Sequence, residues 1–327
     1  MTTAKAILCD WFMFMMSIPR TEPMTKVQKF TQWSSVLAYC VGGGSLLVCP
    51  QLWRILLQLD FLGRTEGYLR VVGLGILIIG FLLVVSARSN YQDPIHGSIL
   101  GSILSRGIYV NGVLLMLILR DMLPLSFALF FMCLDTSLSL ITLVIWCRET
   151  KGASMSLFFR ESLTPILKCR GVTSGGSIAA IFFVGLFQLF FWLVYVIRPD
   201  IAQYLLQLDD FQGHSIGFLA GVFFTLSIHG WYLVANASTV NRPFVPAAVF
   251  YRIVFNIPVL IILFLFDQIE RNLCLALFGF DVCFSIVILV IVAFSKTKVS
   301  TTEADEQKLL PPGEKEKIKS EIGRAHV

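Results

Sequence analysis

The stretch YLRVVGLGILIIGFLLVVSA, residues 68–87, decides the fold. Its twenty positions hold a single charged residue, Arg70. A helix rises 1.5 Å per residue, so a run of this length covers about 30 Å, the thickness of the hydrocarbon core of a bilayer. Lipid offers the backbone no hydrogen-bond partners, and a helix satisfies all of them within its own segment. The stretch therefore predicts a transmembrane helix.

Further runs of the same kind indicate how often the chain crosses the membrane. The 327 residues are 56% hydrophobic and only 14% charged, whereas a soluble domain carries about 25% charged residues. We therefore expect an all-α polytopic membrane protein with about eight transmembrane helices. The other seven predicted spans are 33–53, 97–119, 122–146, 177–197, 216–236, 244–266 and 272–294.

An internal repeat divides these spans into two groups. The sequence LLQLD at 56–60 recurs identically at 205–209, and Pro50 precedes the first copy by the same distance as Pro199 precedes the second. Each unit contains four spans, an even number, so both copies insert in the same orientation. The sequence predicts two tandem parallel four-helix repeats, residues 33–146 and 177–294. Charged positions recur in the same order, Arg106 with Arg252 and Asp135 with Asp281.

These four charges are expected to lie inside the membrane. Arg106 and Asp135 each lie 14 residues from the turn at 120–121, hence about 21 Å from it along adjacent antiparallel helices. A lone charge at mid-bilayer costs at least ~2.5–3.5 kcal/mol, so we expect each Arg to pair with the Asp of its own repeat. Two interpretations stay open: a structural ion pair that fixes helix register, or a polar cavity that binds an ion, proton or solute. The expected supporting residues, about one turn beyond the charges, are Ser139, Ser285, Asn111 and Asn256.

The segments outside the spans set the orientation. With the N-terminus inside, the inner segments carry 13 Lys and Arg residues and the outer ones six, which predicts that both termini are cytoplasmic. Residues 1–32 form a cytoplasmic segment, with Met24 as an alternative start, and 147–176 form a basic cytoplasmic linker. We expect 295–327 to be a disordered tail. Its end, EIGRAHV at 321–327, resembles a translated sequencing adaptor.

The stretch from Gly80 to Asp135 begins with GFLLVVSARS and continues to Arg106. It resembles the small bacterial four-helix membrane proteins of the DoxX-like kind. Each half of the chain, about 110 residues, would correspond to one such protein. The family is functionally mixed, so the resemblance implies an architecture rather than an activity. The second half departs from the pattern, since Ser238 stands where the first has Arg88.

The motifs that are missing exclude several kinds of function. The sequence has no phosphate-binding loop, no H-E-x-x-H and no G-x-S-x-G, so we expect neither an enzyme nor a cofactor or metal. The basic residues lie between apolar runs and do not predict nucleic-acid binding. The leading hypothesis is transport of a small solute or ion through a polar site between the repeats. The alternative is a non-transporting membrane scaffold or assembly factor, and the expected partners are the lipid bilayer and homo- or hetero-oligomeric subunits.

Overall fold

The computed structural model describes residues 24–88, 96–168, 176–239 and 244–309. The predicted segment before Met24 and the adaptor-like end lie outside these residues. Within the described part every regular element is a helix. The protein is therefore an all-α polytopic membrane protein.

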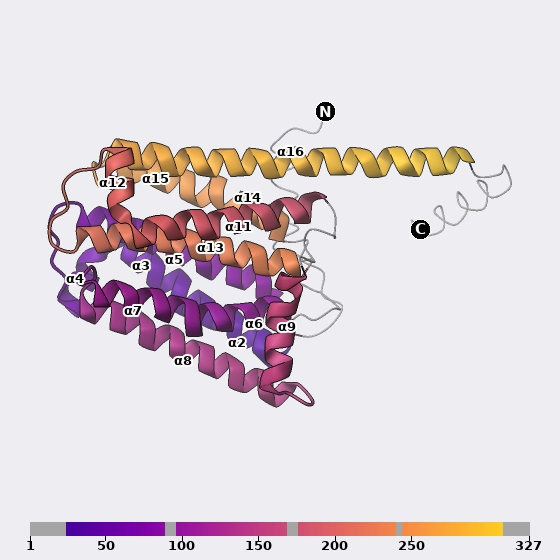
Figure 1. The fold of residues 1–327 in the computed structure, drawn as a ribbon, viewed down its shortest axis with the longest axis horizontal. Coiled ribbons are helices and arrows are strands. Elements are labelled where there is room, and N and C mark those ends of the chain that lie inside the picture. The colour runs from indigo at the N-terminus through magenta and orange to yellow at the C-terminus, as the bar shows by residue number, and fades with distance from the viewer. Residues whose placement is uncertain (1–23, 89–95, 169–175, 240–243, 310–327) are drawn as a thin grey trace.

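The long helices lie roughly side by side in one bundle (Figure 1). Seven helices in the described part are long and apolar enough to cross a membrane, and a bent pair at the N-terminus gives an eighth when it is counted as one span. Their elements are α2–η1–α3 (Lys26–Ser34, Ser35–Val41, Gly42–Val48), α5 (Thr65–Arg88), α6–η2–α7 (His96–Leu104, Ser105–Val110, Asn111–Leu119), α8 (Leu125–Glu149), α11 (Gly176–Ile197), α13 (Ser215–Ser238), α14–η3–α15 (Phe244–Tyr251, Arg252–Asn256, Ile257–Leu265) and α16 (Arg271–Leu309).

Two helices form the centre of the bundle. In α5 and α13, 78% and 83% of the apolar window is buried within the protein, whereas in α8 and α16 the figure is 22%. The central pair approaches closely, since a Cβ built on Gly75 would lie 2.2 Å from Oγ1 of Thr225. The outer helices expose large apolar side chains, as helices that face lipid do.

The first span ends earlier than expected. It was predicted over 33–53, but the helix starts at Lys26, ends at Val48 and bends by 101° into α4 (Pro50–Leu57). Pro50 lacks a backbone N–H and pushes Cys49 out of the helical region, to φ −125° and ψ 59°. Pro50 then begins α4, where the missing N–H costs nothing. The second short helix, α12 (Pro199–Leu206), starts in the same way.

Two connecting segments are more helical than predicted. The linker at 147–176 contains α9 (Met155–Leu167), whose first turn is capped by the Ser154 hydroxyl, an acceptor for the N–H of Leu157. Helix α16 continues to Leu309, past residue 295 where the tail was predicted to begin.

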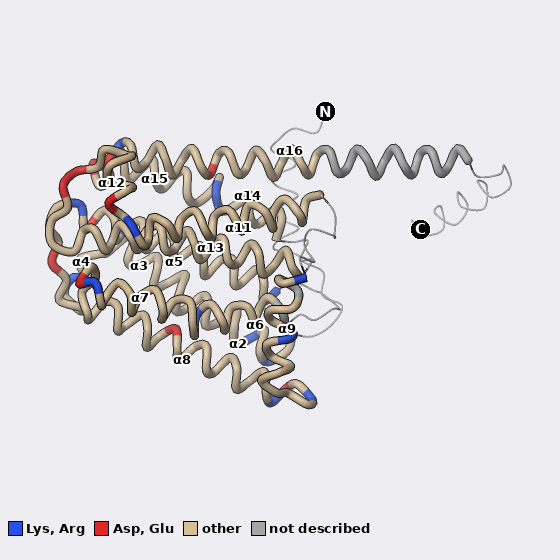
Figure 2. The backbone as a smooth tube through the Cα atoms, viewed as in Figure 1, with Lys and Arg blue, Asp and Glu red and all other residues tan. Residues whose placement is uncertain are grey.

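Charged residues gather at the two ends of the bundle, and few lie between (Figure 2). We call the end that holds α4, α12 and the turns at Asp121 and Asp267 the turn end. Acidic residues concentrate there. The opposite end holds α9 and the first residues of α2 (Figure 1).

Several features occur in both halves of the chain. Helices α4 and α12 both have eight residues and end at a glutamine in the left-handed conformation, Gln58 with φ 53° and Gln207 with φ 50°. Helices α5 and α13 both have 24 residues. The turns at Asp121 and Asp267 share a positive φ as well. A duplicated unit would give these matches, and the duplication stays a prediction.

Candidate functional site

Three polar residues of the candidate site lie on π-helical segments. Tyr39 lies in η1, Arg106 in η2 and Arg252 at the start of η3. Such segments are rare and are frequent at functional sites, because the inserted residue frees a carbonyl and re-aims the side chains. Nδ2 of Asn111 donates to the carbonyl oxygens of Arg106 and Gly107, at 3.1 and 2.9 Å. Asn111 therefore stabilises the backbone of η2 and does not join the charged pair.

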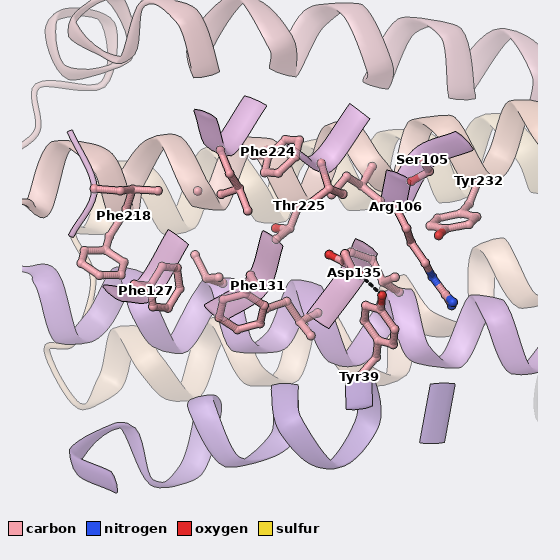
Figure 3. A pocket seen from close by; sticks show the side chains of 18 residues that line it. Tyr39, Ser105, Arg106, Phe127, Phe131, Asp135, Phe218, Phe224, Thr225 and Tyr232 are labelled. Atoms are coloured by element: carbon pink, nitrogen blue, oxygen red, sulfur yellow. Dashed lines mark hydrogen bonds between the residues drawn. The ribbon is translucent and has the colours of Figure 1, made fainter. Parts of the chain in front are cut away.

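Arg106 is a buried cation without a good partner. It is 1% exposed, and none of its three guanidinium nitrogens makes a hydrogen bond of acceptable geometry within the described chain. The guanidinium carbon lies 4.9 Å from the centre of the Tyr39 ring, a cation–π contact. The ring of Tyr232 lies on its other side (Figure 3).

Asp135 does not form the direct ion pair that the sequence predicted. One of its oxygens, Oδ1, accepts a hydrogen bond from the Tyr39 hydroxyl, and no ion pair to Arg106 is present in the described structure. Tyr39 thus contacts both charges, Arg106 by its ring face and Asp135 by its hydroxyl (Figure 3). The expected bond from Ser139 to Asp135 is also wrong, since Oγ of Ser139 lies 3.1 Å from the carbonyl oxygen of Ile103.

The second pair is closed. Nε of Arg252 lies 3.4 Å from Oδ1 of Asp281, and its Nη2 donates to Oε1 of Gln188 at 2.9 Å. Its Nη1 also donates to the carbonyl of Ala248. Asn256 completes the pair, since its Nδ2 donates to Oδ2 of Asp281 at 2.9 Å. The charges in this half therefore form a direct ion pair, and Nε of Arg252 is its only guanidinium nitrogen without a hydrogen bond within the described residues.

Ser285 was expected to join this second network and does not. Its Oγ is buried and has no hydrogen-bond partner within the described residues. His229 of α13 places Nε2 3.0 Å from the carbonyl oxygen of Gly75. Because a carbonyl can only accept, Nε2 carries the proton. This bond ties α13 to α5 at the centre of the bundle.

A cavity of about 60 Å³ adjoins Arg106. Helices α5, α7, α8 and α13 form its walls, and Arg106, Asp135, Tyr39 and Tyr232 lie at one end (Figure 3). Towards the turn end the lining is apolar and largely aromatic. A cavity needs roughly 10–15 Å³ to hold one water, so this one accommodates a few waters or a small solute.

A smaller cavity of about 20 Å³ adjoins the closed pair. Trp192 lines it and stacks on Phe223 with 5.4 Å between the ring centres. Gly43 has the same spacing to Pro50 as Trp192 has to Pro199. Gly43 instead lets two backbones meet, since a Cβ there would lie 2.5 Å from the nitrogen of Leu77. Trp192 therefore stands at the position where the first half has a close backbone contact.

The sequence interpretation missed Tyr39 and Gln188. Each approaches the Arg from the first helix of its half, a helix that the pairing argument did not include. A signal was present, because each is a polar-tipped residue eleven positions before the proline that ends its span. Contacts from a third helix are not visible in the spacing of the other two.

Fold and site together define a multi-pass, all-helical integral membrane protein with charged residues buried between its helices. Comparisons with protein-family models, with curated proteins and with solved structures give no match.

Proposed function

We propose that the protein binds a small solute inside the membrane, at Arg106, and carries it across the bilayer. The observation that supports this is a fully buried guanidinium that makes no hydrogen bond of good geometry within the described residues and adjoins a cavity. An unpaired buried charge costs several kcal/mol, and such a cost persists in a fold when a ligand completes the site.

The second half supplies an internal comparison for this proposal. The Arg and Asp of that half pair directly, and an amide from Gln188 and one from Asn256 complete the network. The chain therefore contains one buried arginine that is paired with its aspartate and one that is not. The closed pair fits a structural role, and the open one fits a binding role in a duplicated protein whose halves have diverged.

The alternative is a membrane scaffold in which all four charges only fix packing. The closed pair of Arg252 and Asp281 favours this role for its own half. The DoxX-like resemblance is compatible with both functions and does not distinguish them.

The test compares two matched substitutions, Arg106→Gln and Arg252→Gln. R252Q leaves Asp281 buried without its cation, so we expect the free energy of unfolding to fall by about 3–5 kcal/mol. R106Q removes no hydrogen bond, so we expect a change of less than about 1.5 kcal/mol, with a gain as readily as a loss. Reversible unfolding of the purified protein in lipid nanodiscs measures both.

Equal and large losses of stability in the two variants would favour the scaffold. Both variants make the same change of side chain, so the loss of side-chain volume is equal and does not account for a difference. A variant with both changes should show the R252Q loss alone, because the hydrogen-bond and ion-pair partners of Arg252 do not include Tyr39, Asp135 or Tyr232.

A further inference from the structure

The first cavity brings two opposite charges close together without letting them neutralise each other. The guanidinium nitrogens of Arg106 make no hydrogen bond of good geometry within the described residues, although the side chain of Tyr232 lies against them. Only Oδ1 of Asp135 has a hydrogen-bond partner, the Tyr39 hydroxyl. Both residues line the same cavity, and both are at least nine-tenths buried. The site as a whole is electrically neutral, with its positive and negative ends apart.

A ligand that satisfies this arrangement needs two complementary ends in its head group. An acceptor, best a carboxylate, would meet the guanidinium in the bidentate geometry that these groups favour. A donor, best an ammonium, would meet the free oxygen of Asp135. A purely anionic head would leave Asp135 unpaired and place a second negative charge beside it, and a purely cationic head would do the same to Arg106.

The rest of the cavity indicates the body of the ligand. From the charged end it runs towards the turn end between aromatic rings, with Phe131 and Phe224 nearer the charges and Phe127 and Phe218 further away (Figure 3). Thr225 provides one of the few polar groups along the way. Such a lining favours an apolar group, aromatic or branched aliphatic, over a sugar or a phosphate.

From these observations we infer that the solute is a small amphipathic zwitterion of the α-amino-acid type, with its carboxylate at Arg106, its ammonium at Asp135 and an apolar side chain pointing to the turn end. The inference rests on the proposed function, since it names the class of solute for the same site. Gln188, Trp192 and the closed ion pair leave no equivalent site in the second half.

The test uses four probes on the full chain in nanodiscs of phosphatidylglycerol, a lipid whose head is not a zwitterion. L-phenylalanine carries both head charges and an apolar body, 3-phenylpropanoate lacks the ammonium, 2-phenylethylamine lacks the carboxylate, and glycine lacks the body. Calorimetric titration should show phenylalanine binding at least about tenfold more tightly than each of the other three, since tenfold corresponds to 1.4 kcal/mol.

Two matched variants assign the ends of the head group. Asp135→Asn should abolish the advantage of phenylalanine over 3-phenylpropanoate, and Asp281→Asn should leave that advantage unchanged. Arg106→Gln should abolish the advantage of phenylalanine over 2-phenylethylamine. Uptake of labelled phenylalanine into proteoliposomes should fall with R106Q as well.

Two results would overturn the inference and leave the proposed function standing. One is equal binding of phenylalanine and 3-phenylpropanoate, which would remove Asp135 from the site. The other is no binding of any probe while R106Q keeps the stability of the protein. A large loss of stability in R106Q would overturn the proposed function itself, so the two failures are distinguishable.

Discussion

Tyr39 contacts both charged residues beside the first cavity, although its hydroxyl is its only polar side-chain group. Its ring accepts Arg106 on its face while its hydroxyl donates to Asp135. Residue spacing predicted the depth of both charges but not this third partner. Depth follows from the rise per residue, whereas the direction in which a long side chain points depends on every helix around it.

Removing the Tyr39 hydroxyl should destabilise the protein. Tyr39→Phe keeps the ring under the guanidinium and deprives Asp135 of its hydrogen bond, a loss of about 1–3 kcal/mol in the free energy of unfolding. Adding Asp135→Asn to Y39F should restore part of that loss, because the uncharged amide costs less to bury. Unfolding in nanodiscs measures the three variants.

Tyr195→Phe is the matched control for this change. The ring of Tyr195 packs on Phe191 with 5.1 Å between the centres, and its hydroxyl makes no hydrogen bond within the described residues. Y195F should therefore leave stability within about 0.5 kcal/mol of the wild type. A Y39F protein as stable as Y195F would show that the hydroxyl contributes nothing to the site.

At the scale of elements, the two halves hold each other at the turn end. The N-terminal turn of α5 packs against the turn of the second half, where a Cβ on Gly67 would lie 1.7 Å from the carbonyl oxygen of Gln268. The start of α13 packs in the same way on the first half, where a Cβ on Gly217 would lie 1.9 Å from the carbonyl oxygen of Met122. The two halves of the chain therefore interlock at the turn end.

Adding a methyl group at either contact should separate these elements. We expect Gly67→Ala and Gly217→Ala each to lower the free energy of unfolding by about 1–3 kcal/mol, because the new Cβ meets a backbone oxygen that cannot move aside. Gly112→Ala is the control, since a Cβ there meets nothing within 4 Å, and it should gain about 0.5–1 kcal/mol in its helix. Similar values for all three variants would contradict the interlocked contact.

For the whole molecule, charges at the turn end also join the halves. Arg64 bonds Asp209 and Asp267 of the second half, each at 3.1 Å. Partial burial disfavours its charged form, but the two hydrogen bonds outweigh this and raise the pKa of Arg64. The last carbonyl groups of the two short helices are satisfied in the same way. Ser126 donates to the carbonyl of Leu57 at the end of α4, and Asn272 donates to that of Leu206 at the end of α12.

The basic residues predict that the turn end faces outward and both termini face the cytosol. Two exposed cysteines at opposite ends test this, Cys49 beside α4 and Cys147 near the end of α8. In single-cysteine variants on intact cells, a membrane-impermeant maleimide should label Cys49 and leave Cys147 unlabelled until the membrane is permeabilised. Labelling of Cys147 before permeabilisation would indicate the opposite orientation.

The sequence by itself determined that the chain crosses a membrane as helices, where most of the spans lie, and that four charges are buried between them. These properties follow from apolar length and helical rise, which are local. The tertiary structure decided which charges pair. Arg252 forms an ion pair with Asp281, whereas Tyr39 contacts both Arg106 and Asp135, which form no ion pair within the described residues. Side chains from a third helix make that difference, and packing between distant segments is what places them.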